Sequence, residues 1–148
     1  MARHDLVRLF FAPLAIAAGA ACGSDPAAVE STSFIGAPIA QITSSPGGWS
    51  VTLRASPTTP ARGVDAFELE VKDASGTAVD GLELAVVPWM SSHGHGASVV
   101  PEIKPIGGGV YVATDVELFM PGAWELRVTM RDATRALEEH ATVPLTID

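Results

Sequence analysis

The sequence has 148 residues, 47% of them hydrophobic, with 14 glycines and 11 prolines. This length predicts a single domain, and the composition favours many short strands joined by turns around one hydrophobic core. The formal net charge is −8 and the lysines and arginines form no cluster, which argues against a nucleic-acid partner.

The N-terminus has the features of a secretory signal peptide. Arg3 and Arg8 flank the start of the chain, and the apolar run 9–21 follows them. A basic segment, a short apolar segment and small residues before a cleavage point are typical of such a peptide. Thirteen apolar residues are too few for a spanning helix, which needs about 20. We therefore predict that residues 1–21 are a signal peptide.

Cys22 is the single cysteine, so no intrachain disulfide can form. Its position after Gly19-Ala20-Ala21 resembles a bacterial lipobox, whose cysteine becomes lipid-modified and forms the new N-terminus. Gly19 departs from the pattern, because an aliphatic residue usually stands three before the cysteine. We expect a lipoprotein anchored through Cys22 to the cell envelope, on the periplasmic face of the inner or outer membrane. Ordinary secretion is the alternative.

Residues 22–37 are rich in Ser, Ala, Pro and Gly and show little periodicity. This composition predicts a flexible tether that reaches roughly 20 Å on average and holds the domain near the membrane. The folded domain is then expected over residues 38–148.

Within 38–148, apolar and polar residues alternate with a period of two, which is typical of half-buried strands. About seven such segments predict an all-β fold, an immunoglobulin-like antiparallel β-sandwich. The Cys-Trp-Cys pattern of true immunoglobulin domains is absent. The residues predicted to face inward are Trp49, Val51, Leu53, Phe67, Leu69, Val71, Leu82, Leu84, Val86, Val110, Val112, Val116, Leu118, Trp124, Leu126, Val128, Met130, Ala141, Val143, Leu145 and Ile147.

Several local signals refine this prediction. Pro88 and Pro144 indicate edge strands or bulges, because proline cannot donate to a ladder. Pro121-Gly122 predicts a tight turn that joins its two flanking strands into a hairpin. The segment 133–140 is the only one that could be helical.

Two methionines and two histidines are expected to meet at one rim of the sandwich. The alternation continued through Pro88 turns Met90 inward, and Met120 closes the inward face that begins at Val110. His93 and His95 follow Met90 on a glycine-rich loop that can fold back. Thioethers and imidazoles would then lie within reach of one ion.

Copper is the metal that this donor set favours. Thioethers suit Cu(I), imidazoles suit both copper ions, and a site without cysteine is robust in an oxidising compartment. Trp89 or Trp124 could cap the ion through its ring face. Zinc fits less well, since two histidines without cysteine or a placed carboxylate make a poor tetrahedral site. Equally, methionine is a common filler of core gaps, and the histidines could belong to a solvated loop.

Catalytic signals are lacking. The cluster Ser91-Ser92-His93 makes no triad by itself, and neither a Gly-x-Ser-x-Gly elbow nor a nucleotide-binding glycine motif occurs. The acidic residues are expected on exposed strand faces, with His140 beside them at the surface. We therefore expect no enzymatic activity.

Four short motifs occur in order along the chain: Pro88-Trp89-Met90, Gly94-His95-Gly96, Gly109-Val110-Tyr111 and Phe119-Met120-Pro121-Gly122-Ala123-Trp124-Glu125-Leu126. Together they resemble the YtkA-like and FixH-like extracytoplasmic domains. The resemblance implies a small β-sandwich tethered outside a membrane, and some members are associated with copper handling or with assembly of haem-copper oxidases. It maps Met90, His95 and Met120 onto motif positions. FixH-like proteins carry a transmembrane anchor, which weakens transfer of the oxidase-assembly role.

Two hypotheses follow from the sequence. In the first, the protein is a lipid-anchored extracytoplasmic copper-binding protein, a chaperone or scavenger, with Met90, His93, His95 and Met120 as ligands. In the second, it is an immunoglobulin-like structural or interaction module of the cell envelope, whose rim loops bind another envelope protein without metal.

Overall fold

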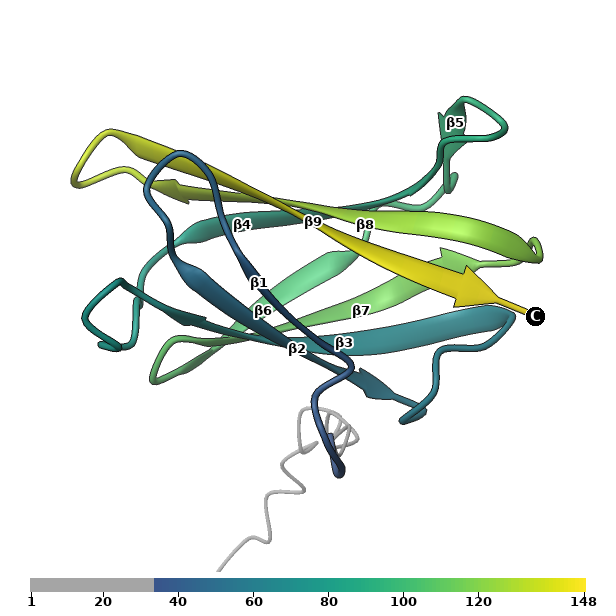
Figure 1. Ribbon diagram of the computed structural model, residues 1–148, viewed down its shortest axis with the longest axis horizontal. Helices are drawn as coiled ribbons and strands as arrows, with labels where there is room; N and C mark the ends of the chain where they lie inside the picture. Colours follow the sequence, from purple (N-terminus) through teal and green to yellow (C-terminus); the bar gives the residue numbers. More distant parts are fainter. Residues whose placement is uncertain (1–33) are drawn as a thin grey trace, which may run out of the picture. The chain divides into compact units, whose positions relative to one another are not determined.

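The computed structural model describes residues 34–148, so the predicted signal peptide, Cys22 and most of the predicted tether lie outside the described residues. Nine β-strands and no helix occur in this part of the chain. They form two antiparallel sheets that face one another (Figure 1). The all-β sandwich is confirmed, with nine strands rather than about seven. No helix within residues 34–148 is long and apolar enough to cross a membrane.

The larger sheet has the strand order β1-β2-β3-β7-β6. Its strands are β1 (Ala40–Thr43), β2 (Ser50–Ser56), β3 (Gly63–Lys72), β6 (Glu102–Gly107) and β7 (Val110–Leu118). The smaller sheet has the order β5-β4-β8-β9. Its strands are β4 (Glu83–Met90), β5 (His95–Gly96), β8 (Gly122–Asp132) and β9 (Leu137–Ile147). The chain therefore crosses between sheets after β3, after β5 and after β7.

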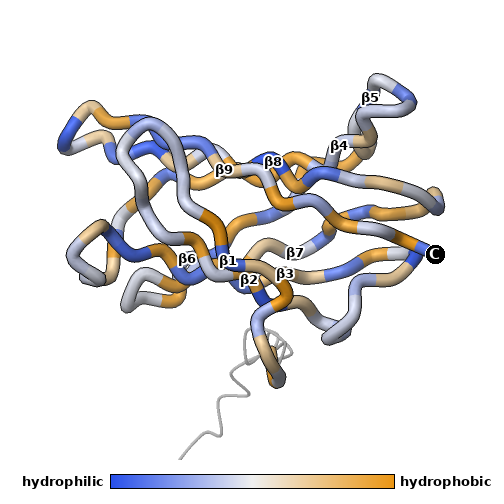
Figure 2. Tube along the Cα trace, in the orientation of Figure 1, coloured by the Kyte–Doolittle hydropathy of each residue, from blue (hydrophilic) through white to orange (hydrophobic). Residues whose placement is uncertain are grey.

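The core lies between the sheets and follows the predicted alternation on most strands. Hydrophobic and hydrophilic residues alternate along the strands in Figure 2. Each large apolar side chain that is fully buried contributes roughly 1.5–3 kcal/mol. Predicted inward residues that are buried are Trp49, Val51, Leu53, Phe67, Leu69, Val71, Leu82, Val86, Val116, Leu118, Trp124, Leu126, Val128, Met130, Ala141, Val143 and Ile147, while Leu84 and Leu145 are partly buried against them.

The predicted inward face is wrong in the first half of β7. Tyr111 and Ala113 are buried there, and Val110 and Val112 are only half-buried. The register shifts further along, where β7 places an extra residue opposite β3. Asp115 has a φ of +58° at this bulge. A bulge reverses the alternation on one side of it, and no sequence pattern marked this one.

The expected hairpin across Pro121-Gly122 is also wrong, because β7 and β8 belong to different sheets. The real hairpin joins β8 to β9, which pair along their full length. Residues 133–136 form its turn and residues 137–140 begin β9, so the segment 133–140 is not helical. Both proline predictions are confirmed: β9 is an edge strand, and β5 covers β4 only at Trp89 and Met90.

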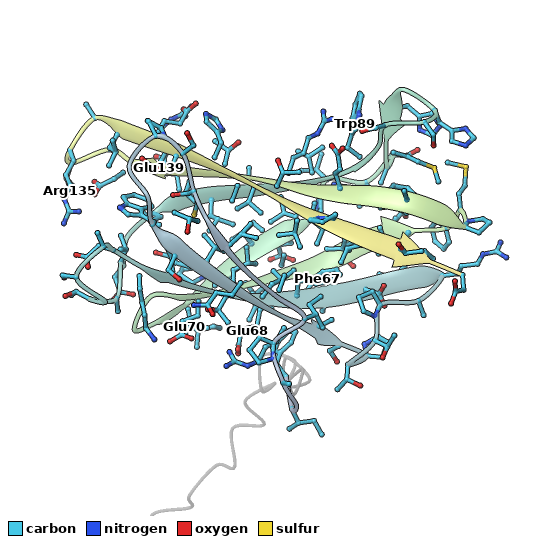
Figure 3. The ribbon with its side chains drawn as sticks, in the orientation of Figure 1. Phe67, Glu68, Glu70, Trp89, Arg135 and Glu139 are labelled. Atoms are coloured by element: carbon cyan, nitrogen blue, oxygen red, sulfur yellow. The ribbon has the colours of Figure 1, made fainter. Side chains whose placement is uncertain are left out.

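Three carboxylates, Asp65, Asp132 and Glu139, depart from the expected exposed positions, and Glu139 is the most completely buried of them. Glu139 is fully buried beneath the loop between β1 and β2 (Figure 3). Ser44 Oγ donates to one carboxylate oxygen at 2.6 Å, and the Gly47 amide donates to the other. Ser45 and His140 exchange two backbone hydrogen bonds beside it, at 2.8 and 2.9 Å. These contacts attach the loop of one sheet to β9 of the other. His140 itself is exposed, as expected.

We predict that Glu139→Ala lowers the free energy of unfolding by about 2–4 kcal/mol, because a buried hydroxyl and a buried amide then lose their acceptor. Chemical denaturation measures this change. Glu138→Ala on the same strand is the control, since that carboxylate lies at the surface and its removal leaves no buried group without a partner. Equal effects of the two substitutions would contradict the structural role of Glu139.

Candidate metal centre

A tight turn brings the end of β4 back on itself. The amides of His93 and Gly94 both donate to the Met90 carbonyl, at 3.1 and 3.0 Å. Gly94 has a φ of +70°, a conformation that favours glycine. The chain then returns as β5, where His95 lies directly opposite Met90.

Met90 and His95 consequently share one face of the smaller sheet. Directly opposed residues of an antiparallel pair point to the same side, with Cβ atoms about 4.5–5.5 Å apart. Met90 is 1% exposed and packs into the core, so this face is the inner one. His95 is exposed, because β5 lies at the outer edge of the sheet.

The two imidazoles lie close to one another. The ring centroids of His93 and His95 are 5.8 Å apart, with the planes inclined at 69°. His95 Nδ1 lies 3.0 Å from the Gly96 carbonyl oxygen. A carbonyl can only accept, so the proton of this hydrogen bond lies on Nδ1, and in the neutral ring Nε2 is then the nitrogen with a free lone pair. A backbone carbonyl on the second ring nitrogen is the usual way in which a metal-binding histidine is oriented.

A pocket of about 160 Å³ opens between β5 and the connection from β7 to β8. His95 and Met120 both line it, and Trp124 Nε1 donates to the Met120 carbonyl at 2.9 Å. Sulfur atoms, yellow in Figure 3, are seen at this end of the sandwich. The lining residues are His95, Gly96, Ala97, Ser98, Glu117, Phe119, Met120 and Trp124.

Met90 lies next to the same connection. A Cβ on Gly122, which has a φ of +125°, would come within 2.9 Å of Met90 Cε. The terminal methyl group of Met90 therefore packs against the backbone two residues after Met120. The structure thus places Met90, His93, His95 and Met120 at one end of the sandwich. His95 and Met120 line the pocket, whereas Met90 and His93 are not among its lining residues.

Trp89 points to the opposite face of β4. The Arg127 guanidinium carbon lies 4.6 Å from its ring centroid. Glu125 accepts hydrogen bonds from Arg127 and from Ser91 Oγ, which hold the pKa of this carboxyl below its usual value. This outer-face network ties the turn after β4 to β8. Of the two tryptophans considered as a cap, Trp124 is the one that lines the pocket.

Sequence reasoning missed Glu117 and Phe119 as neighbours of the site. The sequence alternation marks them as outward residues, and only the pocket seen in the structure groups them with His95 and Gly96 of β5. Within residues 34–148, no group of three or more His, Cys, Asp or Glu side chains could hold a metal ion.

The model of the YtkA-like family matches residues 43–129, which is more than half of the chain. This chain belongs to the YtkA-like family. The matched range includes Met90, His93, His95 and Met120, so the candidate site lies inside the family domain. The similarity to FixH-like domains stays a prediction. No curated protein and no solved structure matches the chain.

The contact between Met90 and Gly122 can be tested by Gly122→Ala. We expect it to lower the free energy of unfolding by about 1–3 kcal/mol more than Gly63→Ala does, because only residue 122 has a neighbour to displace. Gly63 is a matched control, with a φ of +136° and no atom within 4 Å of its would-be Cβ. In a Met90→Ala background the excess should disappear. Equal costs in the native background would show that Met90 does not pack there.

Proposed function

We propose that this YtkA-like protein binds copper as Cu(I) at the rim formed by the β4–β5 turn and the β7–β8 connection. The observation that carries the proposal is the shared pocket of His95 and Met120, with Met90 directly opposite His95. The protein would act as a chaperone or scavenger, without turnover of its own.

The chemistry of the donors supports Cu(I). Thioethers and neutral imidazoles are soft or borderline ligands that suit this ion, whereas hard cations gain nothing from methionine. His95 and Met120 line the same pocket, so His95 would supply Nε2 and Met120 its thioether sulfur. His93 and Met90 are the neighbours that would complete a three- or four-donor set. Met90 is buried, so its thioether would act from the floor of the site.

Trp124 adds an aromatic surface. Its ring lines the pocket, and its Nε1–H is held by the Met120 carbonyl. A ring face beside a monovalent cation contributes a favourable cation–π interaction. The Trp89 ring instead packs against the Arg127 guanidinium on the outer face of the sheet.

The location of the protein follows from its N-terminus and is part of the proposal. We infer a lipoprotein anchored by Cys22, with the YtkA-like domain on the extracytoplasmic side of a membrane. A lipid anchor would hold a copper-binding domain beside envelope proteins that supply or take the metal.

Titration of the purified domain with Cu(I) against a chromogenic chelator tests the copper site. We expect a dissociation constant well below about 1 μM, and a loss of at least about tenfold in Met90→Leu/Met120→Leu. Met→Leu nearly conserves volume and costs less than about 1.5 kcal/mol, so the variants should fold. We also expect Cu(I) binding to quench tryptophan emission, and this quenching should persist in Trp89→Phe.

Met130→Leu is the matched control for that experiment. Met130 is a fully buried methionine on β8, paired opposite Leu84, and it does not line the rim pocket. Its substitution should leave Cu(I) affinity unchanged. Affinity no better than micromolar in the native domain, or equal affinity in the double variant, would contradict the proposal. The chain would then be an immunoglobulin-like structural or interaction module, in which the same substitutions change stability alone.

Lipidation is tested separately. We expect the full-length protein, expressed in bacteria, to incorporate a labelled fatty acid and to fractionate with membranes. Cys22→Ser should abolish both, because the chain contains no other thiol. Labelling that survives Cys22→Ser, or native protein without label, would show ordinary secretion instead.

A further inference from the structure

Exposed apolar side chains gather at one end of the larger sheet. Seven large hydrophobic residues of the described chain are exposed, and five of them are Ile35, Val64, Val99, Val100 and Phe119. They lie just before β1, at the start of β3, just before β6 and just after β7. In the antiparallel order β1-β2-β3-β7-β6, the starts of β1, β3 and β6 lie at the same end of the sheet as the finish of β7. We call these five residues the apolar end.

Val64 and Phe119 are neighbours within the apolar end. The register of β3 against β7 places Val64 opposite Glu117, and Phe119 lies two residues further along. Because side chains alternate between faces, Phe119 continues the face of Glu117 and lies diagonally across from Val64, a separation of about 7–8 Å. The two residues are 53% and 56% exposed. Arg62 Nε donates to the Phe119 carbonyl at 3.3 Å and so attaches the β2–β3 loop to this position.

The chain also enters the domain at this end of the sheet. The described residues begin at Phe34, and a Cβ on Gly36 would lie 3.4 Å from Thr58 Cγ2 in the β2–β3 loop. Even a fully extended chain spans at most about 43 Å between Cys22 and Phe34. The ten residues of β3 are about 33 Å long. An anchor at Cys22 would therefore act on the apolar end, with the opposite end of the sheet farther away by about the length of a strand.

We propose that the apolar end rests on the surface of the lipid bilayer, an inference that rests on the proposed lipidation of Cys22. A contiguous exposed apolar patch is typical of an interaction site. A few apolar side chains bind a membrane weakly, and stable attachment takes two signals. The acyl chains are the first signal. They raise the effective concentration of the domain at the membrane, so that the weak second contact through Val64 and Phe119 is occupied.

Charge has little part in this contact. The Arg62 cation at this end is offset by the exposed carboxylates Glu102 and Asp115, and the whole chain has a formal net charge of −8. Attraction to anionic headgroups is therefore not expected, and the contact should form on neutral, zwitterionic lipid.

The orientation has a consequence for the rim pocket. Phe119 belongs both to the apolar end and to the lining of that pocket, which also includes His95 and Met120. Contact between Phe119 and the bilayer would bring the pocket close to the headgroups. A metal held there could pass to or from a membrane-embedded protein without rotation of the domain.

Tryptophan reporters at the two ends of the larger sheet test the orientation. Full-length lipidated Phe119→Trp is reconstituted into phosphatidylcholine vesicles with and without bromine on the acyl chains near the headgroup. Ile106→Trp is the matched control, because Ile106 is 63% exposed and lies at the opposite end of the same sheet. After subtraction of the native protein, we expect brominated lipid to lower the emission of Phe119→Trp by at least about half and that of Ile106→Trp by less than about a tenth.

Val64→Asp added to Phe119→Trp should reduce the quenching, because a charged side chain is unfavourable against acyl chains. Equal quenching of the two reporters, or quenching of neither in vesicles that carry the lipidated protein, would overturn the orientation and leave the anchor intact. Quenching of neither, together with concentration-dependent self-association, would assign the apolar end to a second copy of the chain instead. Protein without lipid at Cys22 would overturn the anchor and the orientation with it, whereas the Cu(I) titration is independent of both.

Discussion

The inward face of β4 is the constraint on which the rim of this sandwich depends. Val86, Pro88 and Met90 are buried in succession, and the side-chain period of two leaves them no other orientation. A shift of one residue would expose all three, so the hydrophobic core sets the register of β4 against β8. The tight turn in which the His93 and Gly94 amides donate to the Met90 carbonyl then returns the chain as β5, with His95 opposite Met90.

The candidate site arises where two crossovers between sheets pass one another. One leads from β5 to β6 and the other from β7 to β8, and both lie at the same end of the molecule. Neither crossover is a tight hairpin, so the backbone leaves space between them. Small residues line one wall, and Met120 with Trp124 lines the other. Site residues from distant parts of the chain thus meet on short segments that are held by strands at both ends.

Charged side chains have two distinct roles in this protein. Glu139 and Glu125 accept hydrogen bonds from side chains of neighbouring segments and thereby attach loops to strands, which makes the framework rigid. Glu117 has no such partner among the described side chains and is one of the residues that line the rim pocket. Both roles were hidden in the sequence, because carboxylates at alternating strand positions all read as solvent-exposed.

Much of the fold was determined by local pattern alone. The alternation of apolar residues identified most of the core, the all-β class and the end of the sandwich to which Met90 and Met120 belong, because burial requires the same period wherever a strand covers a core. The tertiary structure decided what depends on pairing between distant segments. It showed that β7 and β8 lie in different sheets, that a bulge at Asp115 turns Tyr111 inward, and that Met120 and His95 line one pocket. These features depend on which strands lie side by side. The alternation of apolar and polar residues along one strand carries no information about its neighbours.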